Sequence, residues 1–447
     1  MAREALEEYL EAVGAEIRWR RARRPLLREL SDHIADQAAA FQAQGLEEGP
    51  ALERAVAEMG DPAAVGRDLD RLHRPQNRWS LALGVLFLLL AGLLLQHLSA
   101  RFLQDSEADY YFRRQGFGVL LSVGVLAGLW FSDCTLLLRR RRMAPAALGL
   151  LLAACLAGGI ALPWLRARTL VTYLALLMPV PYAALLCRLQ GRGGGAVLLC
   201  GLGALTLTLP AFGFLATSAG IVAAGTMLLV LGAAAGLGWF SGRRGKALLL
   251  AWGPALALGA LLLLRSPGFL LRLQVFLHPE GDPLGTGFQY LALRAGELLL
   301  PGEFYGNACD YFLAFLAQAL GRWVFPAAAG LLLLSAVLLL RRTARLQSRA
   351  GKLLALSALL PLLLQAGLYL LFNLGWSPLG PLSLPFLSYG MGYLAVNAAL
   401  VGVLLSVFRM DRLLRDGPAT DPARPRPDHW DLPLGRGTLS IQYRRGT

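Results

Sequence analysis

Hydrophobic and polar positions divide the chain into two regions with different patterns. Up to about residue 74, apolar residues recur every three or four positions between charged ones, as in Tyr9, Val13 and Ile17. This spacing places them along one face of a helix. From residue 80 onward, apolar residues form long runs, most of them close to the ~20 residues that a helix needs to cross a bilayer. The pattern predicts an all-α, polytopic membrane protein preceded by a small helical domain.

About ten transmembrane helices are expected from these runs. They cover residues 80–99, 116–138, 143–164, 169–187, 195–215, 217–240, 247–264, 323–340, 353–373 and 389–408. The predicted domains are a cytoplasmic helical prefix over 1–75, a transmembrane domain over 78–410 and a cytoplasmic tail over 411–447. The tail contains five prolines and mixed charges, which predicts disorder.

Composition supports the membrane interpretation. Apolar residues make up 56% of the 447 residues and charged residues only 16%. The net charge is +14, but residues 1–74 hold 11 arginines against 15 acidic residues, so the rest of the chain carries +18. Excess arginine beside apolar runs favours membrane lipids over nucleic acid as the partner. The first 75 residues contain no signal-peptide core, so insertion is expected to depend on internal segments.

Arginine clusters predict the orientation of the helices. They fall on every second connection, at 139–142, 188–192, 243–246, 341–352 and 409–415. Because basic residues favour the cytoplasmic side, both termini are expected in the cytoplasm and the long connection 265–322 outside. Within that connection, the apolar and polar residues of 288–299 have the spacing of an amphipathic helix. Phe288, Leu291 and Leu298 lie on its apolar face and Arg294 lies on its polar face. This predicts a helix lying along the membrane surface.

Few residues outside the prefix domain could carry chemistry. The five cysteines form no CxxC pair, the five histidines do not cluster, and we expect no metal site. The sequence indicates no cofactor and leaves a bound divalent cation open. Asp310 stands immediately before an apolar stretch, where a carboxylate is costly unless it has a partner or a task. A functional role and a simple interfacial position are both compatible with this placement.

Two segments resemble the SEDS (shape, elongation, division and sporulation) family, which includes RodA-, FtsW- and SpoVE-like membrane proteins. The first is RLQVFLHPEGDPLGTGFQYLALRAGELLLPGEFYGNACDYFLAFLAQALG, from Arg272 to Gly321. The second is NLGWSPLGPLSLPFLSYGMGYLAVNAALVGVLLSVFR, from Asn373 to Arg409. They are similar to the family's "DP-G-GYQ" run with its "DFIFA" motif, and to its "N-G--P--G-PLPF-SYGG" signature.

The resemblance implies a peptidoglycan glycosyltransferase of the bacterial cytoplasmic membrane. Such an enzyme polymerises lipid II, or a related undecaprenyl-linked precursor, on the outer face in elongation, division or sporulation. Its usual partner is a class B penicillin-binding transpeptidase. Asp310 aligns with the aspartate that the family needs for catalysis. The candidate substrate-binding residues are Gln289, Arg272, Arg322, Ser388 and Tyr389, in which the two arginines would hold the leaving diphosphate.

Departures from the family pattern keep two other functions open. Gln318 and Ala319 stand where the family has two glutamates, and Met391 replaces the last glycine of "SYGG". The family's early Arg-Trp motif has no clear counterpart in residues 100–170. A catalytically degenerate scaffold or regulator of a wall synthase is therefore an alternative. A transporter of lipid-linked precursors is a further one, although no internal repeat supports it.

The prefix domain resembles a second known unit. Its stretches EEYLEAVGAEI, ELSDHIADQ and AVAEMGDPAAVGRDL are similar to HAAS-type domains, short cytoplasmic units that precede membrane proteins. The resemblance implies a regulatory or signalling role without chemistry of its own. A helical cap that only assists folding or assembly is the other interpretation.

Overall fold

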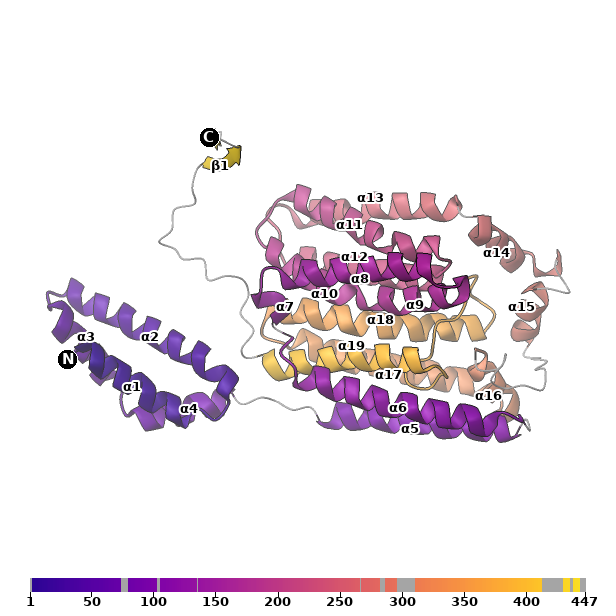
Figure 1. Cartoon of the computed structure of the whole chain (residues 1–447), viewed down its shortest axis with the longest axis horizontal. Helices are drawn as coiled ribbons and strands as arrows, with labels where there is room; N and C mark the ends of the chain where they lie inside the picture. Colours follow the sequence, from indigo (N-terminus) through magenta and orange to yellow (C-terminus); the bar gives the residue numbers. More distant parts are fainter. Residues whose placement is uncertain are drawn as a thin grey trace.

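The computed structural model describes residues 2–73, 79–102, 105–134, 136–265, 267–281, 286–295, 310–411, 429–434 and 437–442. Helices dominate both regions of the chain, as predicted (Figure 1). The apolar residues that recur at helical spacing in the prefix are buried together, and Val13, Ile17 and Ile34 are fully covered.

Four helices build the N-terminal domain: α1 (Ala2–Glu16), α2 (Arg20–Ala43), α3 (Glu48–Glu58) and α4 (Pro62–His73). Asp61 caps α4, because its carboxylate accepts hydrogen bonds from the backbone N–H groups of Ala63 and Ala64. The Asp70 carboxylate accepts one from the backbone of Arg18 at 3.0 Å, which ties α4 to the end of α1. These contacts give the domain a core of its own.

Among the residues that the structure describes, ten helical segments are long and apolar enough to cross a membrane, in agreement with the sequence prediction. They are α5 (Trp79–Phe102), α6 (Ala108–Phe131), α8 (Met143–Ala161), the run Leu165–Leu189, α11 (Gly194–Gly213), α12 (Thr217–Gly236), α13 (Arg244–Leu264), α17 (Val324–Ala344), α18 (Arg349–Asn373) and α19 (Met391–Met410). The run Leu165–Leu189 contains α9 (Trp164–Leu177), α10 (Pro179–Leu186) and the 3₁₀ turn η1 (Cys187–Leu189). The helices lie side by side in one bundle (Figure 1).

The second span begins and ends earlier than its apolar run. The sequence places it at 116–138, whereas α6 ends at Phe131 and a separate short helix, α7 (Leu136–Arg139), follows. The difference arises because α6 includes Arg113 and Arg114 in its first turns, at the bundle end where charged side chains reach the interface. At the other end, Arg188 donates hydrogen bonds to the carbonyls of Leu137, Arg140 and Arg141, so the residues after α6 form a turn there.

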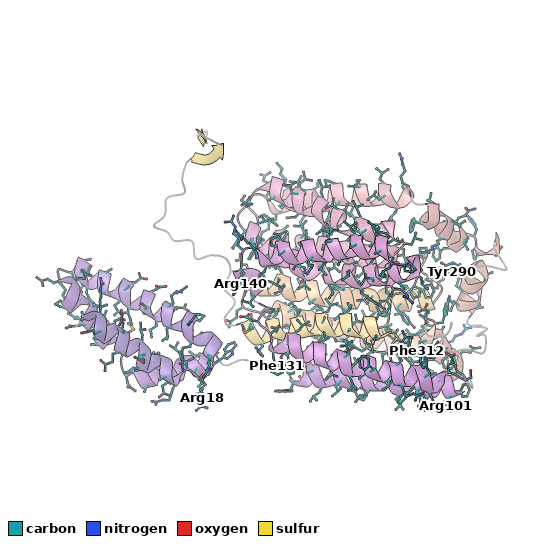
Figure 2. All side chains as sticks on the ribbon, viewed as in Figure 1. Arg18, Arg101, Phe131, Arg140, Tyr290 and Phe312 are labelled. Carbon is teal, nitrogen blue, oxygen red and sulfur yellow. The ribbon has the colours of Figure 1, made fainter. Side chains whose placement is uncertain are left out.

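The bundle has two distinct ends. Figure 2 shows Phe131 and Arg140 at one end, which we call the α7 end, and Arg101, Tyr290 and Phe312 at the other, which we call the α16 end. The α16 end carries the short elements α14 (Pro267–Leu277), η2 (Pro279–Gly281), α15 (Thr286–Ala295) and α16 (Phe312–Leu320). The site candidates therefore gather at the α16 end, opposite the arginine clusters.

The segment 374–390 enters the bundle without regular structure. Its backbone is satisfied by side chains from three spans: Gln96 donates to the carbonyl of Leu387, Gln115 accepts from the N–H of Gly390 at 3.2 Å, and Ser218 donates to the carbonyl of Gly380 at 2.8 Å. Irregular backbone at membrane depth requires such partners. The segment thus forms a fixed wall inside the α16 end.

The tail contains an element that the sequence did not predict. The strands β1 (His429–Leu434) and β2 (Gly437–Gln442) pair antiparallel, with Trp430 opposite Ile441 and Leu432 opposite Leu439. Apolar residues at every second position of both segments have the period of a strand. Over these residues the structure differs from the predicted disorder. The rest of the tail after residue 411 lies outside the described residues.

Candidate functional site

Asp310 stands one residue before the N-cap of α16, and α18 fixes its backbone. The side-chain amide of Asn373 donates to the carbonyl of Asp310 at 3.2 Å and accepts from the N–H of Ala314 at 3.1 Å. The hydroxyl of Tyr369 accepts from the N–H of Phe312 at 3.1 Å. These bonds satisfy first-turn N–H groups that a helix leaves unpaired. Asn373 and Tyr369 are each 1% exposed, so the support is rigid.

Apolar packing holds α16 in place beneath this hydrogen-bonded start. Phe312, Leu313 and Phe315 are buried in a cluster that includes Tyr369 of α18 and Ala108 of α6. The helix thus buries one side in this cluster, which also contains Ala100 of α5 and Val324 of α17, and leaves Gln318 exposed. As a result, the carboxylate is held at a defined point of the bundle end.

Two groups on other elements share the electrostatic environment of Asp310. Burial raises the pKa of the Asp310 carboxyl, although part of the residue reaches solvent, and the positive charge of Arg168 on α9 opposes the shift. No contact ion pair within 4 Å joins the two charges among the described residues. Burial and then the charge of Asp310 raise the pKa of Tyr311 to about 12, so its phenol stays protonated. Arg168 is therefore the cation whose charge acts on the candidate catalytic acid.

The end of α18 and helix α15 form a second part of the site. Gly375, at φ 75°, follows α18 in a left-handed conformation, and the next residue donates to the carbonyl of Leu371 at 2.9 Å, which completes a Schellman motif. A Cβ at Gly375 would lie 3.0 Å from the carbonyl oxygen of Tyr290, so α15 approaches here closely. Glycine meets both requirements.

Arg294 attaches α15 to this turn. Its Nε donates to the carbonyl of Gly375 at 3.0 Å and its terminal nitrogen donates to the carbonyl of Phe276 at 3.1 Å. The guanidinium also lies over the rings of Trp376, at 4.9 Å, and Phe276, at 5.1 Å. The arginine predicted to lie on the outward polar face is thus the main anchor of the helix.

The predicted apolar face of the surface helix is partly wrong. Among the side chains of α15 that the structure describes, 290–295, the buried ones are Tyr290, Ala292 and Leu293. Ala295, which the pattern also places on the apolar face, is exposed. The anchoring of Arg294 turns the helix toward the bundle and selects this face. Residues 296–299, which the sequence assigned to the same helix, lie outside the described residues.

The structure places the predicted substrate-binding residues in different settings. Ser388 is 6% exposed, and its hydroxyl accepts from the N–H of Leu384 at 2.7 Å. The ring of Tyr389 packs edge-on against Tyr111, with 5.6 Å between centroids. Both residues therefore shape the wall made by 374–390. Gln289 belongs to α15, but its side chain lies outside the described residues.

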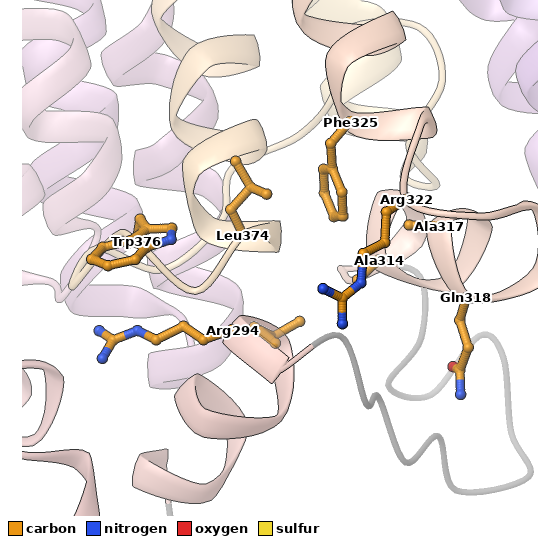
Figure 3. A pocket seen from close by; sticks show the side chains of 9 residues that line it. Arg294, Ala314, Ala317, Gln318, Arg322, Phe325, Leu374 and Trp376 are labelled. Carbon is orange, nitrogen blue, oxygen red and sulfur yellow. The ribbon is translucent and has the colours of Figure 1, made fainter.

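Arg272 and Arg322, which the sequence suggested for the diphosphate, differ from Arg168, the arginine whose charge acts on Asp310. Arg272 is exposed on α14. Arg322 donates to the carbonyl of Ala295 and lines a cavity of about 140 Å³. Figure 3 shows the guanidinium of Arg294 beneath Trp376 in the same cavity, with Phe325 and Leu374 on its apolar side. Sequence reasoning missed Arg168, because only packing brings α9 toward α16.

No group of three or more His, Cys, Asp or Glu side chains that could hold a metal ion occurs in the described part of the chain. The four described cysteines, Cys134, Cys155, Cys187 and Cys200, are free and buried. The chemistry of the site must then be argued from Asp310, its neighbouring arginine and the tyrosines around them.

Comparison with known proteins identifies the family. The family of FtsW, RodA and SpoVE, described as "Cell cycle protein", matches residues 204–413, which include α16, α18 and α19. Over these residues, the chain belongs to the SEDS family. Asp310 and its support from Asn373 lie inside the matched region. The chain is a multi-pass membrane protein whose residues 204–413 match this family.

Relatives of the SEDS region are found among curated bacterial proteins. A probable peptidoglycan glycosyltransferase FtsW from Thioalkalivibrio sp. (strain K90mix) is 31% identical over 182 residues, which cover 36% of this chain and 44% of the relative. Stage V sporulation protein E from Bacillus subtilis (strain 168) is 30% identical over 169 residues, which cover 34% of this chain and 45% of the relative. The chain spans about half the length of the curated relatives it matches.

A solved structure shares the fold of the SEDS domain. It is described as "Structural coordination of polymerization and crosslinking by a peptidoglycan synthase complex". The likeness covers 73% of this chain and 97% of the other, with a TM-score of 0.52 and 20% sequence identity. The common fold therefore extends beyond the matched region. The resemblance of the prefix to HAAS-type domains stays a prediction.

Proposed function

We propose that this protein is a peptidoglycan glycosyltransferase that polymerises lipid II, or a related undecaprenyl-linked precursor. The observation that carries the proposal is the carboxylate of Asp310, whose backbone Asn373 holds at the start of α16 and whose ionised form the charge of Arg168 favours. The family match and the names of the relatives supply the reaction class.

The proposed reaction is a displacement at the anomeric carbon of the donor sugar. The 4-hydroxyl of the acceptor sugar attacks this carbon, a new C–O bond forms, and the bond from the anomeric carbon to the diphosphate oxygen breaks. The hydroxyl proton passes to the Asp310 carboxylate, and the bonding electrons leave with the isoprenyl diphosphate. General-base assistance of this kind contributes about 10²–10⁴ in rate. A raised pKa brings the base nearer to the working pH.

The proposal includes an orientation and a partner. The arginine clusters support a cytoplasmic α7 end, with both termini inside and the α16 end facing the outer side of the cytoplasmic membrane. The solved relative belongs to a peptidoglycan synthase complex, which supports a class B penicillin-binding transpeptidase as partner. The partner would cross-link the strands that this chain extends.

Polymerisation of lipid II by the purified full-length protein, with and without a candidate transpeptidase, tests the proposal. Asp310→Asn should abolish product while the thermal unfolding temperature stays within a few degrees of wild type. Glu280→Gln is the matched control, because Glu280 is an exposed carboxylate at the same bundle end. It should keep activity. Unchanged glycan product from Asp310→Asn would exclude the carboxylate from catalysis.

A second function, a scaffold for a wall synthase without its own catalysis, is favoured by one observation. Gln318 and Ala319 occupy the positions of the family's two glutamates, and Gln318 lines the cavity beside Arg322. The double variant Gln318→Glu, Ala319→Glu, which restores the two carboxylates, discriminates the polymerase from the scaffold. A wild-type protein that is inactive with its partner, but stimulates the partner's cross-linking, would support the scaffold.

A further inference from the structure

Two helices, α6 and α9, pack closely against the start of α19. A Cβ at Gly118 of α6 would meet Met391 at 3.2 Å, and a Cβ at Gly392 would overlap the ring of Tyr173 on α9, at 2.2 Å. The rings of Tyr173 and Tyr393 pack edge-on, with 5.0 Å between centroids. The first turn of α19 is thus enclosed by α6 and α9.

One arginine on each flanking helix lies nearer the α16 end than these contacts. Arg114 stands one turn before Gly118, and Arg168 stands more than one turn before Tyr173. The charge of Arg114 reaches Tyr173, and that of Arg168 reaches Tyr393 and Asp310. Arg114 is exposed and Arg168 is half-buried.

Neither arginine is used in holding the fold. Within the described part of the chain, no carboxylate lies within 4 Å of either guanidinium and no carbonyl accepts from one. By contrast, Arg101 at the same end pairs with Asp109 at 2.6 Å, and Arg294 and Arg322 donate to backbone carbonyls. The start of α19 has no side-chain cap, so its positive end is directed toward the same place.

We propose that Arg114 and Arg168 hold the diphosphate of an isoprenyl-linked ligand over the first turn of α19, beside Asp310. Two guanidinium groups, on the two helices that pack against one helix start, suit an anion with two phosphoryl groups, because a guanidinium can bind a phosphoryl group in bidentate fashion. The tyrosine pair forms the floor below them. The proposal rests on the proposed function and replaces Arg272 and Arg322 as the diphosphate residues.

Such a site would serve the reaction because the diphosphate would lie beside Asp310, the proposed base. A diphosphate at Arg168 leaves the anomeric carbon of the donor on the side where Asp310 meets the acceptor. Negative charge that develops on the leaving oxygen is then stabilised by fixed cations. Arg168 would interact with both the leaving group and the base, whereas Arg114 would act on the leaving group alone.

Equilibrium binding of undecaprenyl diphosphate to the full-length protein, in phosphatidylcholine nanodiscs, tests the site. Arg168→Gln and Arg114→Gln should each weaken binding by about tenfold or more, since each removes charge-assisted hydrogen bonds. Arg166→Gln and Arg113→Gln are matched controls, because they remove exposed arginines from the same helices. They should stay within twofold of wild type. Thermal unfolding of each variant monitors the fold.

Three outcomes would overturn the site. In the first, Arg168→Gln and Arg114→Gln bind undecaprenyl diphosphate as tightly as wild type does. In the second, all four variants weaken this binding equally. In the third, phosphatidylglycerol competes for the site as well as the diphosphate does. The second outcome would indicate a diffuse positive field, and the third a lipid headgroup site. If wild type fails to polymerise lipid II while the binding pattern holds, the proposed function fails alone. If it polymerises without the pattern, the site fails alone.

Discussion

At the residue scale, the position of Asp310 depends on uncharged partners. Asn373 bonds to both the Asp310 carbonyl and the Ala314 N–H, so one side chain links the candidate base to the first turn of its helix. The hydroxyl of Tyr369 instead accepts from the N–H of Phe312. The two residues are both buried on α18, but only Asn373 contacts Asp310 directly.

This difference predicts different effects of removing each partner. Asn373→Leu leaves two buried polar groups unpaired and Tyr369→Phe leaves one, at about 1–3 kcal/mol for each group. Both variants should unfold at lower temperature. Only Asn373→Leu should lower kcat by about a hundredfold, because a displacement of about 1 Å is enough for that loss. Equal kcat values in the two variants would show that Asn373 has no positioning role.

The protonation of Asp310 predicts a pH dependence. A base works only when ionised, and the raised pKa means that activity should be lost on acidification at a higher pH than for an ordinary carboxyl. Arg168 favours the ionised form, so Arg168→Gln should raise this pKa further and move the acid limb of kcat to higher pH. Saturating substrate separates this effect from binding. Arg166→Gln should leave the limb in place, and a shift to lower pH in Arg168→Gln would contradict the assignment.

At the element scale, α15 shows how packing can reverse a prediction made from periodicity. A hydrophobic pattern predicts which face is apolar, but it does not account for a cation that lies between aromatic rings and carbonyls. Arg294 gains both kinds of contact from Gly375, Trp376 and Phe276. A cation over an aromatic ring contributes about 0.5–2 kcal/mol, to which the two hydrogen bonds add.

We therefore expect Arg294→Gln to release α15 from the bundle. Amide hydrogen exchange over residues 286–295 should accelerate at least tenfold, because the helix loses its main anchor. Arg272→Gln is the control, since Arg272 is exposed on the preceding helix α14. It should leave exchange unchanged. Wild-type protection in Arg294→Gln would mean that Tyr290 and Leu293 alone hold the helix.

The ten spans could be predicted from sequence because bilayer length and apolar content are local properties. The site could not be. Gln96 and Gln115 support the wall at 387–390 from 291 and 273 residues away, and nothing in their local sequence marks them. Arg168 lies outside the five arginine clusters, and its local sequence does not mark it either. Its role depends on α9 packing against the start of α19, which only the folded chain shows.

At the scale of the whole molecule, the two ends have different chemistry. At the α7 end, arginines donate hydrogen bonds to backbone carbonyls. Arg188 donates to carbonyls around α7, and Arg409 donates to the carbonyl of Phe131 at 3.2 Å. The Asp411 carboxylate accepts from the N–H of Gln347 at 3.0 Å, just before Ser348, the N-cap of α18. The α16 end instead holds the irregular wall, Asp310 and the unpaired Arg168. A catalytic role for the second end requires it to face the compartment of the substrate.

Cysteine labelling of intact cells tests this orientation. Gln318 at the α16 end and Arg140 at the α7 end are both exposed, and Cys134, Cys155, Cys187 and Cys200 are buried. In a Cys309→Ser background, a membrane-impermeant maleimide should modify Gln318→Cys directly. It should modify Arg140→Cys only after permeabilisation, because the proposed orientation, based on the arginine clusters, places that end in the cytoplasm. The reverse pattern would place Asp310 away from an outer-face substrate, and the proposed polymerase could not then work as described.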